Sequence, residues 1–301
     1  MPDHDSERTP FQDRASIEVL APVALSSPII FASPHSGRDY PQELLRNSRL
    51  DRHGLRQSED SYVDLLFDDA PSAGAPLLRA LFPRAFVDVN RARNELDPRM
   101  FADVLPKDAD TRSSRVIAGL GVIPRIVADG HDIYARKLYF IEARRRLGAC
   151  YDPYHQALSS LINEARQQFG CAIIIDCHSM PSAGGAPFRE GEPRIDFVLG
   201  DRFGSSCAPS VTHFAEETLC GQDYEVARNA PYAGGFVASS YGRPKNGVHV
   251  LQIEINRALY LDERRIARTS GFEALRHNMN VLIEKLAALR ADDLWAAQAA
   301  E

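Results

Sequence analysis

Short runs of apolar residues recur along the chain, and two of them lead directly to a histidine. The run at 172–175 has no polar interruption and is rich in β-branched residues. Such a run is typical of a strand buried on both faces, as the strands of parallel sheets are. The run at 28–33 repeats this pattern and leads to His35, as 172–175 leads to His178. Catalytic and binding groups of such sheets lie at the carboxyl ends of strands, so both histidines are expected at a functional site.

The other apolar patterns predict strands that alternate with helices. We expect further strands over 17–25, 77–82, 85–89, 195–200 and 248–257, and helices over 62–67, 132–147, 154–169, 210–220 and 264–289. Segment 119–127 fits either a strand or a mobile loop, and segment 231–247, which is rich in glycine and serine, fits an ordered loop near a site. This alternation predicts an α/β fold with a mostly parallel central sheet flanked by helices. Residues 1–16 are charged and poor in apolar residues, so we expect a disordered tail followed by a single domain over 17–301.

Composition narrows the class of protein. The chain has 301 residues and a net charge of -6, which argues against nucleic acid and anionic membrane surfaces as partners. The polar N-terminus is unlike a signal peptide, and no apolar run approaches the length of a membrane span. Five cysteines without a CxxC pair indicate reduced thiols and a cytoplasmic protein, and disfavour a cysteine-based zinc site. The arginine run at 144–146 is expected on a solvated face.

Polar residues near the strand ends suggest metal chemistry. Two histidines and one carboxylate with an open fourth position are the ligands of a catalytic zinc ion. Glu254 lies among the apolar residues of 248–257, and a carboxylate that does not bind the metal serves as general base. Arg91 follows Asn90 after the predicted strand at 85–89, and a guanidinium matches a substrate carboxylate. The pattern predicts a metal-dependent hydrolase that acts on a small acidic substrate; oligomeric state is left open.

Several segments of the chain resemble the N-formylglutamate amidohydrolase family over about residues 33–263. They are Pro-His-Ser-Gly at 34–37, Ser-Glu-Asp at 58–60, Asp-Val-Asn-Arg at 88–91 with Glu-Leu-Asp-Pro at 95–98, Asp-Cys-His-Ser at 176–179 and Gln-Ile-Glu-Ile-Asn-Arg at 252–257. That family resembles the zinc carboxypeptidases and aspartoacylase, which have a mixed sheet between helices. Asp-Val-Asn-Arg is similar to the Asp-Leu-Asn-Arg of those enzymes, whose Asn-Arg pair binds the substrate carboxylate.

The resemblance implies a set of roles. One zinc ion is held by His35 and His178, Glu254 is the general base for a zinc-activated water, and Asn90 with Arg91 binds the substrate. The implied reaction converts N-formyl-L-glutamate to formate and L-glutamate, a step of histidine breakdown. The implied substrate is thus a small acidic N-acyl amino acid, and a related N-acyl amino acid is an alternative.

The chain departs from the carboxypeptidase pattern at the acidic metal ligand. Those enzymes have a glutamate three residues after the first histidine, whereas this chain has Arg38. The acidic ligand is therefore expected from Glu59 or Asp60, and the family resemblance favours Asp60.

Each of these residues also has a simpler interpretation. Arg91 and Glu254 fit structural ion pairs, the latter with Arg257 for instance, and Asp60 fits an acid at a helix start. Cys177 as a thiol nucleophile is disfavoured, because adjacent strand residues point to opposite faces and the histidine beside it is out of reach. A non-catalytic binding protein for a small acidic ligand is the alternative function, and the presence of Glu254 argues against it.

Overall fold

The computed structural model describes residues 11, 15–127, 130–182 and 194–290, and the chain packs as two compact units. Unit 1 comprises Met1–Glu18, Gly37–Glu59 and Ala80–Gln156, and unit 2 comprises Val19–Ser36, Asp60–Arg79 and Ala157–Glu301. The predicted tail lies largely outside the described residues, but Phe11 within it is buried, with its ring centroid 6.0 Å from that of Phe82. The single domain over 17–301 stays a prediction.

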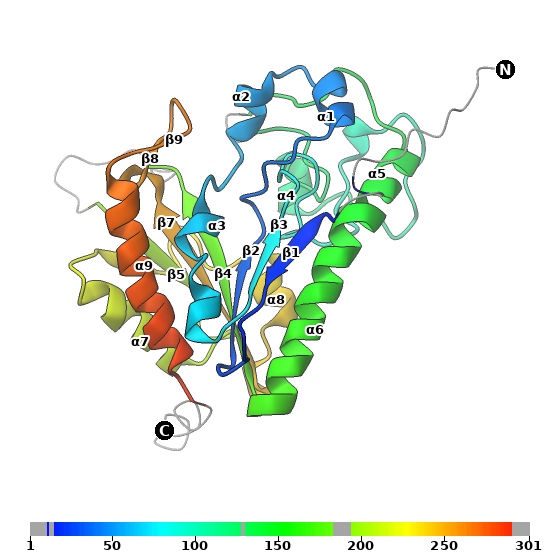
Figure 1. Ribbon diagram of the computed structural model, residues 1–301. Coiled ribbons are helices and arrows are strands. Elements are labelled where there is room, and N and C mark those ends of the chain that lie inside the picture. Colours follow the sequence, from blue (N-terminus) through cyan, green and yellow to red (C-terminus); the bar gives the residue numbers. More distant parts are fainter. Residues whose placement is uncertain (1–10, 12–14, 128–129, 183–193, 291–301) are drawn as a thin grey trace. The chain divides into compact units, whose positions relative to one another are not determined.

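A seven-stranded sheet in the order β1-β3-β2-β4-β7-β5-β6 is centred in unit 2 (Figure 1). Its strands are β1 (Ile17–Leu20), β2 (Ile29–Ser33), β3 (Leu77–Ala80), β4 (Ala172–Met180), β5 (Phe197–Gly200), β6 (Val226–Arg228) and β7 (Val248–Asn256). The central strands β3, β2, β4 and β7 pair in parallel, and β5 is antiparallel to β7. This confirms the α/β class with a mostly parallel, mixed sheet. A separate hairpin joins β8 (Leu261–Asp262) and β9 (Ala267–Arg268).

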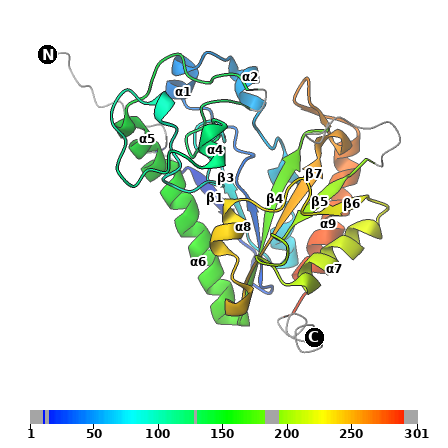
Figure 2. The same ribbon diagram turned by 180° about the vertical axis from the view of Figure 1, so that it is seen from behind.

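Helices of both units flank or precede these strands. They are α1 (Gln42–Asn47), α2 (Arg52–Arg56), α3 (Val63–Leu66), α4 (Ser114–Ile117), α5 (Phe140–Arg146), α6 (Asp152–Phe169), α7 (Pro209–Cys220), α8 (Phe236–Tyr241) and α9 (Gly271–Ala287). In unit 2, α7 and α9 cover one face of the sheet, and α8 with the unit 2 part of α6 lies on the other (Figures 1 and 2). Among the described residues, none of the helices combines the length and apolar character that a membrane span requires.

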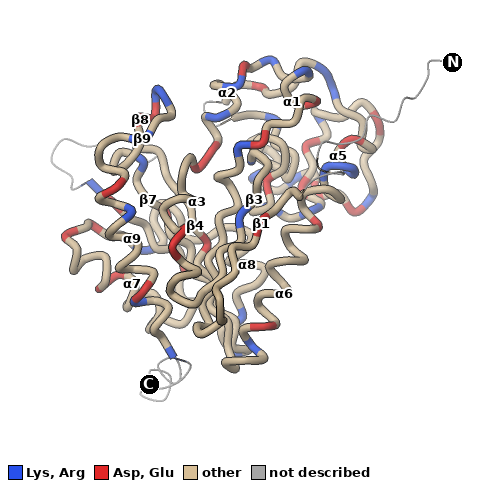
Figure 3. Tube along the Cα trace, viewed as in Figure 1, with Lys and Arg blue, Asp and Glu red and all other residues tan. Residues whose placement is uncertain are grey.

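The two faces of β4 have different roles because side chains alternate along a strand. Ile173, Ile175 and Cys177 belong to the apolar core with α3, α7 and α9, where each buried isoleucine contributes about 1.5–3 kcal/mol of transfer free energy. Asp176 and His178 point to the opposite face. Strands β2 and β5 contain no charged residue, whereas β4 and β7 contain one carboxylate each (Figure 3). The polar face of the central strands is thus the unusual feature of the sheet.

Several predicted elements differ in extent from the structure; the strand predicted over 17–25, for example, ends at Leu20. The helix predicted over 132–147 begins only at Phe140, because the Glu142 carboxylate accepts the Tyr139 N–H at 2.8 Å and caps the first turn. The helix predicted over 264–289 begins at Gly271, because the β8–β9 hairpin takes up the preceding residues. The predicted loop at 231–247 contains the short helix α8.

The strand predicted over 85–89 is wrong. The segment turns in unit 1, where the amides of Phe86 and Val87 both bond to the carbonyl of Pro83. Phe86, Val87 and Val89 are nevertheless fully buried. The apolar run therefore reflects burial in the core of unit 1, which a compact turn satisfies as well as a strand does.

The arginine run at 144–146 is not uniformly solvated. Arg146 is buried, with its guanidinium 4.4 Å from the ring centroid of Phe86, and it donates a 2.7 Å hydrogen bond to the Tyr134 hydroxyl. Its partner carboxylate is Glu43 at 3.1 Å. Aromatic faces and one acid thus replace water around this cation.

Buried His249 makes the stability of the fold depend on pH. Its Nδ1 accepts the Ala208 N–H at 3.1 Å, and burial lowers its pKa to about 4. Because the unfolded chain binds this proton near pH 6.5, stability is lost as pH falls from about 6.5 towards 4. We expect this histidine to lower the free energy of unfolding by about 2 kcal/mol between pH 8 and pH 5. We replace His249 by asparagine, which keeps a hydrogen-bond acceptor. Urea titrations should show that the free energy of unfolding of His249→Asn changes by about 2 kcal/mol less than that of the wild type between pH 8 and pH 5. An equal pH dependence in both proteins would contradict this assignment.

Candidate metal centre

His35 is held by the segment that follows β2. Ser33 and Ser36 exchange a hydrogen bond between their hydroxyls at 3.0 Å, and the Ser36 hydroxyl donates to the Asp60 carbonyl at 2.7 Å. The same hydroxyl accepts the N–H of Asp64 in α3 at 3.2 Å. The Asp60 N–H in turn donates to the His35 carbonyl at 3.1 Å. The small residues after the strand therefore tie His35 and Asp60 together through the backbone.

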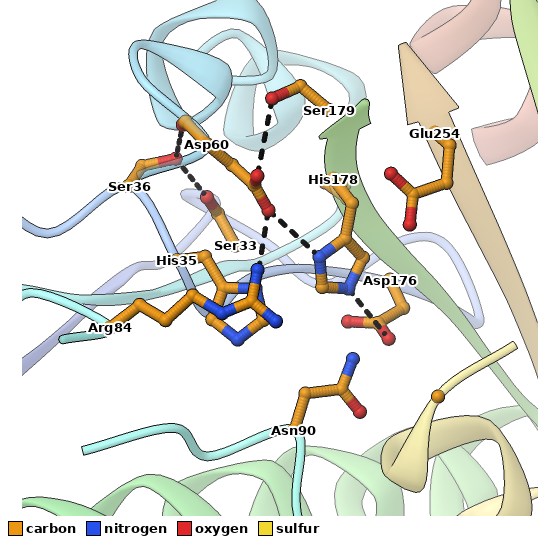
Figure 4. Close-up of polar contacts among 12 residues, drawn as sticks. Ser33, His35, Ser36, Asp60, Arg84, Asn90, Asp176, His178, Ser179 and Glu254 are labelled. Atoms are coloured by element: carbon orange, nitrogen blue, oxygen red, sulfur yellow. Dashed lines mark hydrogen bonds and ion pairs between the residues drawn. The ribbon is translucent and has the colours of Figure 1, made fainter. Parts of the chain in front are cut away.

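The Asp60 carboxylate lies between the two histidines (Figure 4). Its Oδ2 is 3.2 Å from Nδ1 of His35 and 3.1 Å from Nδ1 of His178. Its Oδ1 accepts hydrogen bonds from Arg257 at 3.1 Å and from Ser179 at 3.3 Å. Burial raises the pKa of Asp60, but the two imidazoles outweigh burial and hold that pKa well below its usual range. Oδ2 of the buried Asp60 carboxylate thus faces the two histidines, and Oδ1 faces Arg257 and Ser179.

His178 is oriented by a second carboxylate of its own strand. Its Nε2 lies 3.0 Å from Oδ2 of Asp176, two residues earlier on the same face of β4 (Figure 4). A proton on Nε2 shared with Asp176 leaves Nδ1 free to act as a ligand. Burial lowers the pKa of His178, but Asp176, Asp60 and Glu254 more than offset this and raise it well above its usual value. The three carboxylates around His178 therefore favour a positive charge at its imidazole ring.

The structure brings together His35, Asp60 and His178, and the geometry suits a metal ion. One potential ligand atom from each residue lies within 4.8 Å of the others, and all three residues are buried. Two imidazole nitrogens and one carboxylate oxygen are a donor set that zinc accepts in catalytic sites. The residues present fit a divalent cation on these grounds. Their role as ligands stays a prediction.

Glu254 lies beside this cluster on the neighbouring strand. In the parallel pairing of β4 and β7 it is the register partner of His178, so both side chains share one face of the sheet. Its Oε1 accepts a 2.8 Å hydrogen bond from Gln252, whose own side-chain oxygen accepts the Gly235 N–H at 2.7 Å. Glu254 is therefore held on the polar face by a strand neighbour.

Glu59 and Asp60, the two candidates for the acidic ligand, have different partners. Both carboxylate oxygens of Glu59 accept from Nε of Arg56 at 3.0 Å, and its Oε1 also accepts the Tyr40 hydroxyl at 2.5 Å. Only Asp60 belongs to the cluster of potential ligands found among the described residues.

Asn90 and Arg91 belong to unit 1, where Arg91 has structural contacts. The Arg91 guanidinium donates to the carbonyl of Leu120 at 2.9 Å and to the carbonyl of Asn90 at 2.6 Å, and it lies 3.6 Å from Asp88. Asp88 also accepts the Asn90 N–H at 2.9 Å. The interpretation of Arg91 as a buried structural cation thus has direct support, and its role in substrate binding stays a prediction.

The thiol of Cys177 has the properties of a core residue. It packs among the apolar side chains of unit 2, and its sulfur donates to the Ile175 carbonyl at 3.3 Å. Burial raises the pKa of Cys177 well above its usual value, so the nucleophilic thiolate is disfavoured.

Four residues that contact the cluster lie outside the predicted set: Ser36, Asp176, Ser179 and Arg257. Asp176 precedes His178 by two residues, a spacing that places both on one face of a strand and so provides a usable signal. Arg257, which the sequence suggested as an ion-pair partner of Glu254, contacts Asp60. Nothing local in the sequence joins residues that are 197 positions apart.

Comparisons with known proteins give matches over most of the chain. The sequence model described as N-formylglutamate amidohydrolase matches residues 27–261. An N-formylglutamate deformylase of Pseudomonas aeruginosa is 27% identical over 266 residues, covering 87% of this chain and 93% of that protein. One from Pseudomonas putida is 26% identical over 240 residues, covering 78% and 82%.

Solved structures with a similar fold are also known. The crystal structure of N-formylglutamate amidohydrolase from Ralstonia eutropha JMP134 has a TM-score of 0.86 at 34% identity, covering 94% of this chain and 99% of that one. The structure of gene product Atu2144 from Agrobacterium tumefaciens has a TM-score of 0.63 at 20% identity, with 90% and 93% covered, and indicates the fold alone.

Proposed function

Since the chain belongs to the N-formylglutamate amidohydrolase family and is a hydrolase, we propose that it cleaves the formyl amide of N-formyl-L-glutamate. The products are formate and L-glutamate. The observation that carries the proposal is the buried cluster of His35, Asp60 and His178, with Glu254 on the adjacent strand. Membership of a hydrolase family argues against a binding protein without activity.

The proposed cofactor is one zinc ion, which His35, His178 and Asp60 would hold. When bound, such an ion supplies Lewis acidity, which polarises a carbonyl and lowers the pKa of water to about 7. The residues supply the rest of the site. Asp176 fixes the ring of His178, and the 2.8 Å hydrogen bond from Gln252 holds Glu254.

Glu254 is proposed as the general base. Hydrolysis adds OH to the formyl carbon and H to the amine nitrogen, so one proton must move from water to the leaving group. A carboxylate beside the reacting atoms accepts that proton from water and delivers it to the nitrogen as the C–N bond breaks. The position of Glu254 in register with His178 supports this role.

Asn90 and Arg91 are proposed to bind a carboxylate of the substrate. Asp60, Asp176 and Glu254 surround His178 with negative charge, so an anionic substrate needs compensating donors elsewhere. The support for this pair is the Asp-Val-Asn-Arg motif at 88–91. The guanidinium of Arg91 already donates to two backbone carbonyls, which leaves it less able to bind a substrate. Asn90 is therefore the better residue to test.

We expect Asn90→Asp to raise KM for N-formylglutamate about 10-fold or more with a smaller effect on kcat, because a carboxylate replaces a donor to the substrate carboxylate. Steady-state kinetics measures this change. Asn94→Asp is the matched control, since the exposed Asn94 side chain, also in unit 1, donates to the carbonyl of Asp108 at 2.8 Å. An unchanged KM in Asn90→Asp would remove this residue from the substrate site.

The activity itself is tested by metal analysis and formate release. Purified protein should contain or take up one zinc ion and then release formate from N-formylglutamate. Protein that neither binds zinc nor releases formate after zinc loading would overturn the proposal. A screen of other N-acyl derivatives of glutamate and aspartate decides the alternative of a different N-acyl amino acid. A cytoplasmic location and a place in histidine breakdown belong to the same proposal.

A further inference from the structure

We propose that Arg257 is a positioning residue that fixes the Asp60 carboxylate, so that only Oδ2 of Asp60 faces the two imidazoles. This inference rests on the proposed function, because it assigns a task to the surroundings of the metal site. We call Arg257 and Ser179, with the Asp60 carboxylate that they bind, the clamp. The clamp, and not Asp60 alone, then determines the orientation of the acidic ligand.

The clamp is a triangle of hydrogen bonds within unit 2. Arg257 donates through Nη2 to Oδ1 of Asp60 at 3.1 Å and through Nε to the Ser179 hydroxyl at 3.0 Å. That hydroxyl donates to the same Oδ1 at 3.3 Å. Arg257, Asp60 and Ser179 are 9%, 1% and 5% exposed, so water competes little for these bonds. Two of the three hydrogen bonds end on Oδ1 of Asp60, and the third joins the two donors, Arg257 and Ser179.

Regular structure holds both donors of the triangle. Ser179 lies on β4, directly after His178, and Arg257 directly follows β7. The two strands pair in parallel, with Met180 as register partner of Asn256. The Asn256 side chain accepts the Ala258 N–H at 3.0 Å and donates to the Ile195 carbonyl at 2.8 Å, which fixes the turn that carries Arg257. The two donors of the clamp are therefore placed by β4 and by the turn that directly follows β7, and elements packed in the sheet hold a site more rigidly than a free loop does.

The chemistry requires a guanidinium at this position. Its planar fork reaches the carboxylate and the hydroxyl together, whereas a lysine ammonium is a single point. With Oδ1 occupied, Asp60 offers the cluster one oxygen, at 3.2 Å and 3.1 Å from the two Nδ1 atoms. Without the fork the carboxylate is free to rotate and loses its ordered orientation.

The test is metal affinity, measured by competition with a chromogenic zinc chelator on the full chain. We expect Arg257→Lys and Arg257→Gln to bind zinc about 10–100-fold more weakly, the range for groups that orient a ligand. A purely electrostatic role would predict rescue by lysine and tighter binding in Arg257→Gln. The visible spectrum of the cobalt-loaded protein should also change in Arg257→Lys, because the carboxylate ligand shifts.

Two further variants make the test decisive. Arg276→Lys is the matched control, because Arg276 of α9 forms an ion pair with Asp68 at 2.9 Å in the same unit, and its zinc affinity should equal that of the wild type. Ser179→Ala removes one edge of the triangle and should weaken zinc binding less than Arg257→Lys does. It also decides the matter if the arginine variants do not fold: unchanged affinity in Ser179→Ala then overturns the clamp.

The possible failures are distinguishable. A wild-type protein that binds no zinc contradicts the proposed function. A wild type that binds zinc and releases formate, with unchanged zinc affinity in Arg257→Lys, contradicts the clamp alone. A raised KM with unchanged zinc affinity in that variant would mean that Arg257 contacts the substrate instead.

Discussion

Replacing Glu254 with glutamine is expected to lower kcat about 10²–10⁴-fold, the usual contribution of a general base, and to leave the metal content unchanged. The amide has nearly the same shape and still offers an oxygen to the 2.8 Å hydrogen bond from Gln252, but it cannot accept a proton from water. Because Glu254 is not part of the His35, Asp60 and His178 cluster, the affinity for zinc should be preserved. Single-turnover kinetics together with metal analysis measures both quantities.

A matched glutamate provides the control for this variant. Glu59 is also buried, but its carboxylate is bound by Arg56 and Tyr40. Glu59→Gln should therefore retain both zinc and turnover, at some cost in stability. Loss of zinc in Glu254→Gln would make Glu254 a ligand, and loss of zinc in Glu59→Gln would reopen the choice of the acidic ligand.

The central strands of the sheet were predictable from the sequence because their signal is local. Uninterrupted apolar runs at 28–33 and 172–175 indicate strands buried on both faces, and His35 and His178 follow them directly. All nine residues of β7 are buried, the polar ones included, because the strand pairs with β4 and β5 inside the sheet and helices cover both faces of that sheet. Pairing with neighbouring strands is a tertiary fact that a single segment does not encode.

The rest of the site depended on contacts between distant segments. Asp60 was chosen by resemblance, since an acid before a short helix has many ordinary explanations. The hydrogen bond from Arg257 to Asp60 joins residues 197 positions apart, and no local pattern in the sequence predicts it. In unit 1, Arg146 was expected in water and is instead enclosed by Phe86 and Tyr134. Local patterns thus predicted the framework, and long-range packing decided the partners.

Replacing His178 with alanine is expected to abolish stoichiometric metal binding and activity. The variant loses one of the two proposed nitrogen ligands, so zinc affinity should fall by more than about 100-fold, beyond the range for groups that only support a ligand. It also leaves Asp176 and Asp60 buried without the imidazole between them. We expect the metal-free variant to be less stable by about 3 kcal/mol, the cost of a buried charge that loses its partner. Metal analysis and urea unfolding measure the two effects.

The neighbouring residue provides a sharp control, because successive strand side chains point to opposite faces. Cys177 is equally buried but packs in the apolar core with Ile175. Cys177→Ala should bind zinc and release formate as the wild type does, with a loss of stability of about 1 kcal/mol from reduced packing. Loss of turnover with zinc retained would instead support Cys177 as a thiol nucleophile. Loss of zinc in Cys177→Ala but not in His178→Ala would mean that the metal site lies on the other face of β4.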